Sequence, residues 1–251
     1  MTPRAAARNE REPLVVAGGL AVTANPEPLA RIADAVLLGD GEVTVPPLLA
    51  LMEGVGGGSR RALLERIAKE VPGAYVPSLY GDSELDGRLL PDLPEGFSCK
   101  PAVLDEIDEP AHSVIVTPDT EFSDMFLIEV MRGCPGRCLF CLASHHTTPV
   151  RRVSFDAAWR AVEVGLGHTK RIGLVGLSVG EHPEAARLVD RIAAAGGEVG
   201  FSSLSTRALA GPLLRALAGA GTRSVTIAPE AGTECERARL GKPSGDEETV
   251  E

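Results

Sequence analysis

The sequence lacks a long hydrophobic run. It has 251 residues, 44% of them hydrophobic, and no apolar stretch reaches the roughly 18 residues that a membrane-spanning helix needs. Residues 1–13 also lack the apolar centre of a signal peptide. We therefore expect a soluble, cytoplasmic protein with enough apolar residues for a sizeable core and with no membrane partner.

The sequence also lacks a surplus of basic residues. It has 25 Lys and Arg against 35 Asp and Glu, a net charge of −10, which argues against a protein that coats nucleic acid with a broad basic face. Residues 81–124 contain twelve acidic and two basic residues, so this one segment accounts for the whole imbalance. The segment is rich in proline and has no helical period. We expect an acidic linker at 81–124 between a domain at 1–80 and a domain at 125–251.

Hydrophobic patterning predicts strands that alternate with helices in both halves. In the N-terminal half, the candidate strands are 14–17 and 35–38 and the candidate helices are 27–35 and 60–70. In the C-terminal half, the candidate strands are 126–131, 172–177, 199–204 and 225–228. Three amphipathic helices separate them and begin near Ser154, Pro183 and Pro212. This order predicts an α/β fold, either a doubly wound sheet or part of a (β/α) barrel. A complete barrel is not expected, because four strands cannot close one.

A disulfide framework is the third absence. The chain has five cysteines, an odd number, and three of them are clustered in the loop after strand 126–131. Cys134, Cys138 and Cys141 have the spacing C-x3-C-x2-C, which can hold three irons of a 4Fe–4S cluster and leave the fourth iron open for chemistry. His145 could instead complete a Cys3His zinc site. A cluster, a zinc site and accidental buried thiols all remain open at this point.

The motif C-x3-C-x-aromatic-C, with Phe140 as the aromatic residue, resembles the cluster motif of the radical S-adenosylmethionine (radical SAM) superfamily. Residues 13–28, 39–42, 129–134 and 226–232 also resemble radical SAM proteins with an N-terminal cobalamin-binding domain. The resemblance implies a partial Rossmann-like cobalamin-binding segment followed by about four βα units of a partial radical SAM barrel.

The resemblance also implies a function. Such an enzyme cleaves S-adenosylmethionine reductively to start radical chemistry, an oxidoreductase-type reaction that in cobalamin-dependent members supports methyl transfer. The implied cofactors are a 4Fe–4S cluster, S-adenosylmethionine and, in such members, cobalamin. The implied partners are an electron donor such as flavodoxin or ferredoxin and an unidentified small-molecule or macromolecular substrate. The implied cofactor-binding residues, besides the three cysteines as metal ligands, are Phe140, Gly180, Glu181, Ser203, Arg207 and Glu230.

The chain departs from these relatives in three ways. It has no histidine before His112, so the D-x-H-x-x-G loop that often supplies a cobalamin ligand is absent. Cys235 stands where relatives have an arginine, and barrel strands five and six have no sequence here, so we expect a truncated chain. Two alternative functions stay open: a cobalamin-independent, methylthiotransferase-like enzyme that modifies RNA, and an inactive cluster- or zinc-binding interaction protein.

Overall fold

The structure is a computed structural model that describes residues 2–54, 58–85, 88–92, 100–201, 204–209 and 211–245. Of residues 81–85, 88–92, 207 and 209 only the backbone is described. The chain divides into two compact units, Met1–Leu104 and Asp105–Glu251, here called the N-terminal and C-terminal units. No helix in the described parts of the chain is long and apolar enough to cross a membrane.

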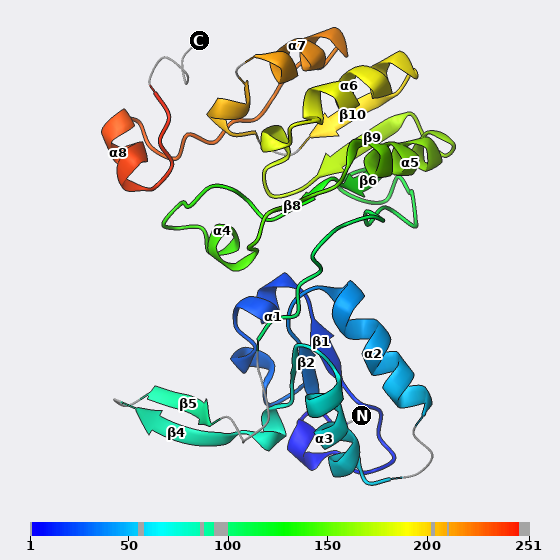
Figure 1. The fold of residues 1–251 in the computed structure, drawn as a ribbon, viewed down its shortest axis with the longest axis vertical. Helices are drawn as coiled ribbons and strands as arrows, with labels where there is room; N and C mark the ends of the chain where they lie inside the picture. Colours follow the sequence, from blue (N-terminus) through cyan, green and yellow to red (C-terminus); the bar gives the residue numbers. More distant parts are fainter. Residues whose placement is uncertain are drawn as a thin grey trace. The chain divides into compact units, whose positions relative to one another are not determined.

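A small sheet of three strands in the order β1-β2-β3 forms the centre of the N-terminal unit. β1 (Val16–Gly18) is parallel to β2 (Ala35–Leu37), and β2 is antiparallel to β3 (Ala74–Tyr75). The helical elements of this unit are η1 (Ala5–Ala7), α1 (Leu20–Ala24), η2 (Glu27–Leu29), α2 (Gly41–Glu53), α3 (Arg60–Glu70) and η3 (Pro77–Leu79). β4 (Gly81–Leu85) and β5 (Arg88–Asp92) form a separate antiparallel pair within the range expected as a linker (Figure 1).

Both faces of β2 are covered, because successive side chains of a strand point to opposite faces. Ala35 and Leu37 pack with Leu48 of α2 and Ile67 of α3, whereas Val36 packs with Tyr75 on the other side. The alternating apolar residues therefore build two small cores around one strand.

One expected helix of the N-terminal unit is wrong. Residues 27–35 form only the short η2 turn and then the start of β2. A helix over this range is excluded because Ala35 is needed as a strand residue beside Val16. By contrast, α3 matches the expected helix at 60–70, and the Ser59 hydroxyl accepts a hydrogen bond from the Ala62 amide at its start.

A parallel sheet in the order β10-β9-β6 organises the C-terminal unit. Its strands are β6 (Met125–Glu129), β9 (Arg171–Val175) and β10 (Glu198–Phe201). The helices α5 (Phe155–Leu166), α6 (Ala185–Ala194) and α7 (Pro212–Gly219) follow them as neighbours in a row (Figure 1). The short elements are β7 (Met131–Arg132), α4 (Leu142–His146), β8 (Arg151–Arg152), η4 (Val179–Glu181), η5 (Thr206–Leu209) and α8 (Glu234–Arg239). The expected α/β class with a parallel sheet, an incomplete (β/α) barrel, is confirmed.

The two faces of this sheet differ. Phe126 of β6 is only 2% exposed and packs so close to α5 that a methyl group on Gly165 would lie 2.6 Å from its ring. On the other face, Met125 extends over Gly173 and Gly200, which carry no side chain. Helices thus cover one face of the sheet. The other face has glycine at two positions and leaves Met125 partly exposed.

The expected fourth strand at 225–228 is reduced to one isolated parallel bridge between Leu204 and Ile227. The Leu204 amide donates to the Thr226 carbonyl at 2.8 Å. Because the chain enters η5 at Thr206, the residues after Leu204 are not extended and cannot continue the pairing with 225–228. Residues 202–203, in the expected third strand, lie outside the described residues.

Candidate metal centre

The cysteine loop, residues 133–141, follows the carboxyl end of β6. Cys134, Cys138 and Cys141 are free thiols of intermediate exposure. The loop begins at Gly133, whose φ of 88° lies in the left-handed region. A Cβ at this position would lie 2.4 Å from the Thr147 carbonyl oxygen, so only glycine permits this turn.

The thiols surround a short piece of backbone. The Gly136 amide donates a hydrogen bond to the Cys134 sulfur at 3.3 Å. A Cβ on Gly136 would lie 3.3 Å from the Cys134 sulfur and 3.8 Å from the Cys138 sulfur, so glycine keeps the space between these thiols clear. This arrangement fits a bound group that the two sulfurs share.

A four-iron cluster places each cysteine thiolate on a different iron, so the three thiols need not converge on one point. Within the described residues, no three His, Cys, Asp or Glu side chains converge where they could hold a single metal ion. His145, the expected fourth zinc ligand, is exposed, and its Nε2 atom lies 3.0 Å from the Cys138 carbonyl oxygen. The fit of a cluster rests on the donor set itself, three thiols on one short loop, which is the set that a 4Fe–4S cluster with one open iron requires.

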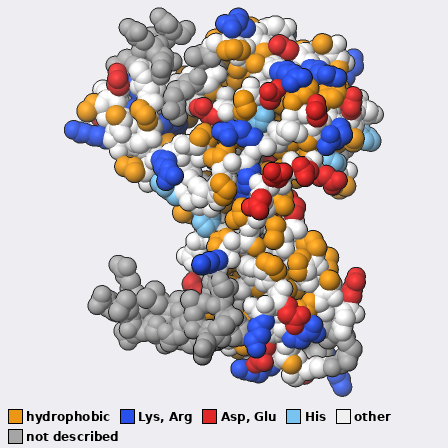
Figure 2. Space-filling model, viewed as in Figure 1, with side chains coloured by type: hydrophobic (Ala, Val, Ile, Leu, Met, Phe, Trp, Pro, Cys, Tyr) orange, Lys and Arg blue, Asp and Glu red, His pale blue; other side chains and the backbone are white. Residues whose placement is uncertain are grey.

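The surroundings of the loop are basic. Residues 130–155 contain four arginines, two histidines and no acidic residue, and the Arg132 guanidinium pairs with the Glu129 carboxylate just before this range. Burial raises the pKa of the Cys138 thiol, and the charge of Lys242 opposes this rise. Figure 2 shows Lys, Arg and His side chains beside apolar ones in the part of the C-terminal unit that carries α4 and α8. Such surroundings stabilise an anionic group bound by thiolates.

Phe140, the predicted aromatic residue of the motif, is 53% exposed. Its neighbours Leu139 and Leu142 are exposed as well. The cysteine loop therefore presents large apolar side chains to its surroundings, which leaves Phe140 accessible to a ligand.

The predicted residues after β9 have partners inside the protein. A Cβ on Gly180 would lie 2.3 Å from the Cβ atom of Ala208, so this glycine lets η4 approach η5 closely. The Glu181 carboxylate accepts a hydrogen bond from the Ser205 hydroxyl at 2.8 Å. The structure thus joins the loops that follow β9 and β10 near the predicted residues. Ser203 lies outside the described residues, and of Arg207 only the backbone in η5 is described.

His182 connects the loop after β9 with the segment before α5. It is 4% exposed, its Nε2 atom donates to the Val153 carbonyl at 3.0 Å, and its Nδ1 atom accepts from the Glu184 amide at 3.1 Å. Burial lowers its pKa, which keeps the ring neutral, the form that this pair of hydrogen bonds requires. Its contacts give it a structural role.

Glu230 lies in a segment that packs on the cysteine loop. Its φ of 73° is unusual for a residue with a side chain, and its carboxylate pairs with Lys242 at 2.9 Å. Arg237, which could have replaced the cation missing at Cys235, is 1% exposed and donates to the Ser244 carbonyl at 2.9 Å. Arg237 therefore holds this segment together.

Sequence reasoning missed Lys242 and the residues beside it. The Leu139 amide donates to the Leu240 carbonyl at 2.9 Å, which brings the end of α8 onto the cysteine loop. No local pattern in 228–244 indicates this contact. The one signal in this segment is the positive charge of Lys242, which follows the predicted Glu230.

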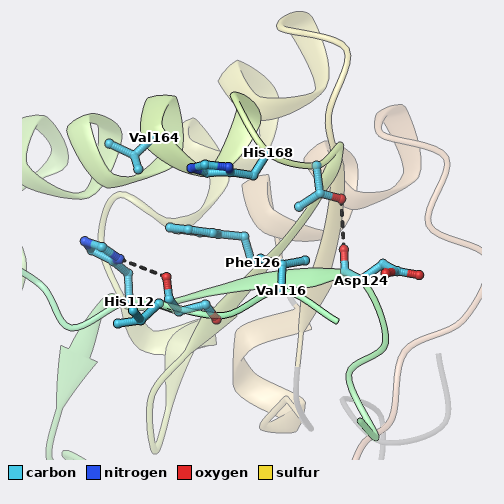
Figure 3. Close-up of a pocket in the computed structure, with 9 residues that line it drawn as sticks. His112, Val116, Asp124, Phe126, Val164 and His168 are labelled. Atoms are coloured by element: carbon cyan, nitrogen blue, oxygen red, sulfur yellow. Dashed lines mark hydrogen bonds between the residues drawn. The ribbon is translucent and has the colours of Figure 1, made fainter. Parts of the chain in front are cut away.

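A cavity of about 690 Å³ lies at the opposite, amino end of β6 (Figure 3). The rings of His112 and His168 stack on Phe126 with centroids 5.3 and 6.3 Å away, and Asp124 and Val164 complete its edge. The cavity is thus separate from the cysteine loop, which follows the carboxyl end of the same strand.

Two family models match the chain. One, described as the N-terminal region of radical SAM proteins, covers residues 1–77, and the other, the radical SAM superfamily, covers residues 128–251. Models of one superfamily thus match both halves of the chain, and they define its class as radical SAM proteins. The chain belongs to the radical SAM superfamily, which confirms the prediction from the cysteine motif. The superfamily's cofactors are a 4Fe–4S cluster and S-adenosylmethionine, which confirms these two expected cofactors.

Relatives of known sequence or structure extend beyond this chain. The uncharacterized protein MJ0966 of Methanocaldococcus jannaschii is 29% identical over 232 residues, which are 90% of this chain and 45% of that protein. Two structures of the radical S-adenosylmethionine methyltransferase TsrM from Kitasatospora setae match with TM-scores of 0.57 and 0.54. Each match is 13% identical and covers 94% of this chain and 46% of TsrM. The chain thus spans about half the length of these relatives.

The TsrM structures differ in what they contain. One holds a tryptophan substrate and the S-adenosylmethionine analogue aza-SAM, and the other holds cobalamin and a 4Fe–4S cluster. At this level of identity the likeness is one of fold, and the fold it indicates is the α/β arrangement described above.

Proposed function

We propose that this chain is part or all of an iron–sulfur enzyme that cleaves S-adenosylmethionine reductively to start radical chemistry. The observation that carries the proposal is the cysteine loop at the carboxyl end of the first strand of the parallel sheet. In (β/α) barrels this end of the strands carries the chemistry. When bound, the reduced cluster would supply the one electron that breaks the sulfonium C–S bond of S-adenosylmethionine, which would give methionine and a 5′-deoxyadenosyl radical.

In this proposal Cys134, Cys138 and Cys141 each hold one iron and leave the fourth iron to S-adenosylmethionine. The clear space at Gly136 and the amide hydrogen bond to the Cys134 sulfur support this assignment. The thiols must be deprotonated to bind metal, so uptake of the cluster releases their protons.

We also propose that residues in the loops after the strands hold S-adenosylmethionine. They are Phe140, Gly180, Glu181, Ser203, Arg207 and Glu230. Exposed Phe140 supports contact with a flat ring, and the hydrogen bond between Glu181 and Ser205 supports a single polar site formed by the loops after β9 and β10. Glu230 is already oriented by Lys242, which supports a role as an acceptor for a ligand hydroxyl.

Cobalamin is a further part of the proposal, with methyl transfer as its chemistry and residues 1–80 as the binding segment. The cobalamin-containing TsrM structure matches 94% of the chain, which supports this assignment. Gly19, at the carboxyl end of β1, has a φ of 103° and open space where a side chain would lie. Because no histidine precedes His112, cobalamin would be held here without a histidine ligand from this segment.

The acidic segment 81–124 is proposed as the linker before a catalytic domain at 125–251. The partners in this proposal are a one-electron donor such as flavodoxin or ferredoxin and a substrate of unidentified class. The free thiols of the cysteine loop support a reducing compartment, so we place the protein in the cytoplasm.

Anaerobic reconstitution with iron and sulfide tests the proposal. We expect the wild-type chain to take up about four irons and four sulfides, and the EPR signal of the reduced cluster to change when S-adenosylmethionine is added. Cys138→Ser should lose the cluster. Cys235→Ser is the matched control, because Cys235 is an exposed cysteine of α8 outside the motif, and it should retain the cluster.

Two results would contradict the proposal. The first is stoichiometric zinc without sulfide in the wild-type chain, which would favour a zinc-binding interaction protein. The second is full iron content in the Cys138→Ser variant. Retention of cobalamin by the same preparation after gel filtration, followed by its visible absorbance, tests the cobalamin assignment separately.

A further inference from the structure

The segment 228–244 forms a strap on the cysteine loop. Besides the hydrogen bond from the Leu139 amide to the Leu240 carbonyl, Gly241 lies directly against the loop. Its φ is 72°, and a Cβ there would lie 2.7 Å from the Arg137 carbonyl oxygen. The strap therefore touches the loop on both sides of Cys138.

The strap is itself held in one shape. The buried Arg237 guanidinium donates to the Ser244 carbonyl at 2.9 Å and to the Ala231 carbonyl at 3.3 Å, which ties the end of the strap to its beginning. Lys242 continues this tie, because its ammonium donates to the Ala228 carbonyl and to the Glu230 carboxylate. A lysine that follows directly after the contact residue Gly241 and is bound at two points has a fixed position beside the loop.

The charge of Lys242 reaches the thiols. Gly241, the residue directly before Lys242, lies against Arg137 and Leu139, the two neighbours of Cys138 in the cysteine loop, so the lysine is held next to this metal ligand. The Lys242 side chain is 21% exposed, so solvent screens its charge only in part.

We propose that Lys242 is a positioning residue that raises the reduction potential of the cluster held by the cysteine loop, and that Glu230 moderates this effect. The inference rests on the proposed function, since it requires a cluster on Cys134, Cys138 and Cys141. One electron added to the cluster increases its negative charge, and a nearby cation stabilises that reduced form. Removing the cation lowers the potential, whereas removing the paired carboxylate raises it.

The test is an EPR-monitored redox titration of the reconstituted full chain without S-adenosylmethionine. For Lys242→Gln we expect the ratio of reduced to oxidised cluster at the wild-type midpoint to fall about tenfold, which corresponds to about 59 mV for one electron. Glu230→Gln should move the midpoint upward, and the double variant should return close to the wild-type value. A purely structural role of Lys242 predicts no such opposite shifts.

Lys170→Gln is the matched control. It removes one exposed lysine of the same unit, at the amino end of β9 and thus at the opposite end of the sheet from the cysteine loop, and its midpoint should equal that of the wild type. A Lys242→Gln midpoint equal to that of this control overturns the inference. If Lys242→Gln does not take up the cluster, Glu230→Gln decides, and an unchanged midpoint then overturns it. Absence of iron and sulfide from the wild-type chain would instead overturn the proposed function.

Discussion

The two ends of β6 differ in how their side chains are used. At the amino end, Phe126 is buried against α5 and lies between the rings of His112 and His168. At the carboxyl end, three thiols remain half-exposed on a loop whose backbone requires glycine at Gly133. The amino end uses its side chains for packing, whereas the carboxyl end leaves reactive side chains accessible. In a (β/α) barrel this division separates stability from chemistry.

The largest expected effect tests the amino end. Phe126→Ala removes a buried ring and should lower the free energy of unfolding by about 3–5 kcal/mol, measured by chemical denaturation. Cluster content in the absence of denaturant should stay unchanged. Phe122→Ala is the control, because Phe122 is exposed and should cost little. A loss of cluster from folded Phe126→Ala would remove the distinction between the two ends.

A smaller effect on stability, with a larger effect on metal content, tests the carboxyl end. Gly133→Ala forces a side chain into a left-handed φ and toward the Thr147 carbonyl, which should cost about 1–3 kcal/mol. Because the cysteine loop must shift, iron and sulfide content should fall as well. Gly219→Ala, in helix α7, meets no other part of the chain within 4 Å, so it should raise the free energy of unfolding by about 0.5–1 kcal/mol and leave the cluster content unchanged. Equal cluster content in the two variants would contradict the role of Gly133.

The smallest effect is expected at His145. His145→Ala removes one exposed interaction with the Cys138 carbonyl, for which we expect a loss of about 0.5 kcal/mol, at the low end for a hydrogen bond. Iron and sulfide content, measured chemically after reconstitution, should match the wild type. Loss of the metal would instead show that His145 is a ligand, as the Cys3His zinc alternative requires.

Local signals predicted the helices with clear starts. The Ser154 hydroxyl caps α5 by accepting from the Ala157 amide, as Ser59 does for α3, and both helices lie where apolar periodicity predicts them. The errors fall where local signals compete with packing. Residues 27–35 have helical apolar spacing, yet Ala35 is used in β2, and residues 225–228 have strand character but lack an extended partner beyond Leu204.

The sequence by itself determined the cysteine spacing, the superfamily and the alternation of strands and helices, because each is encoded within a short stretch of chain. Only the tertiary structure decided that Leu240 and Gly241 pack on the cysteine loop and that the Glu181 carboxylate accepts a hydrogen bond from Ser205. Those contacts depend on the order and register of β6, β9 and β10, which bring the ends of separate loops together. Hydrophobic periodicity specifies which face of an element is buried, but it does not specify which polar loop residue meets another.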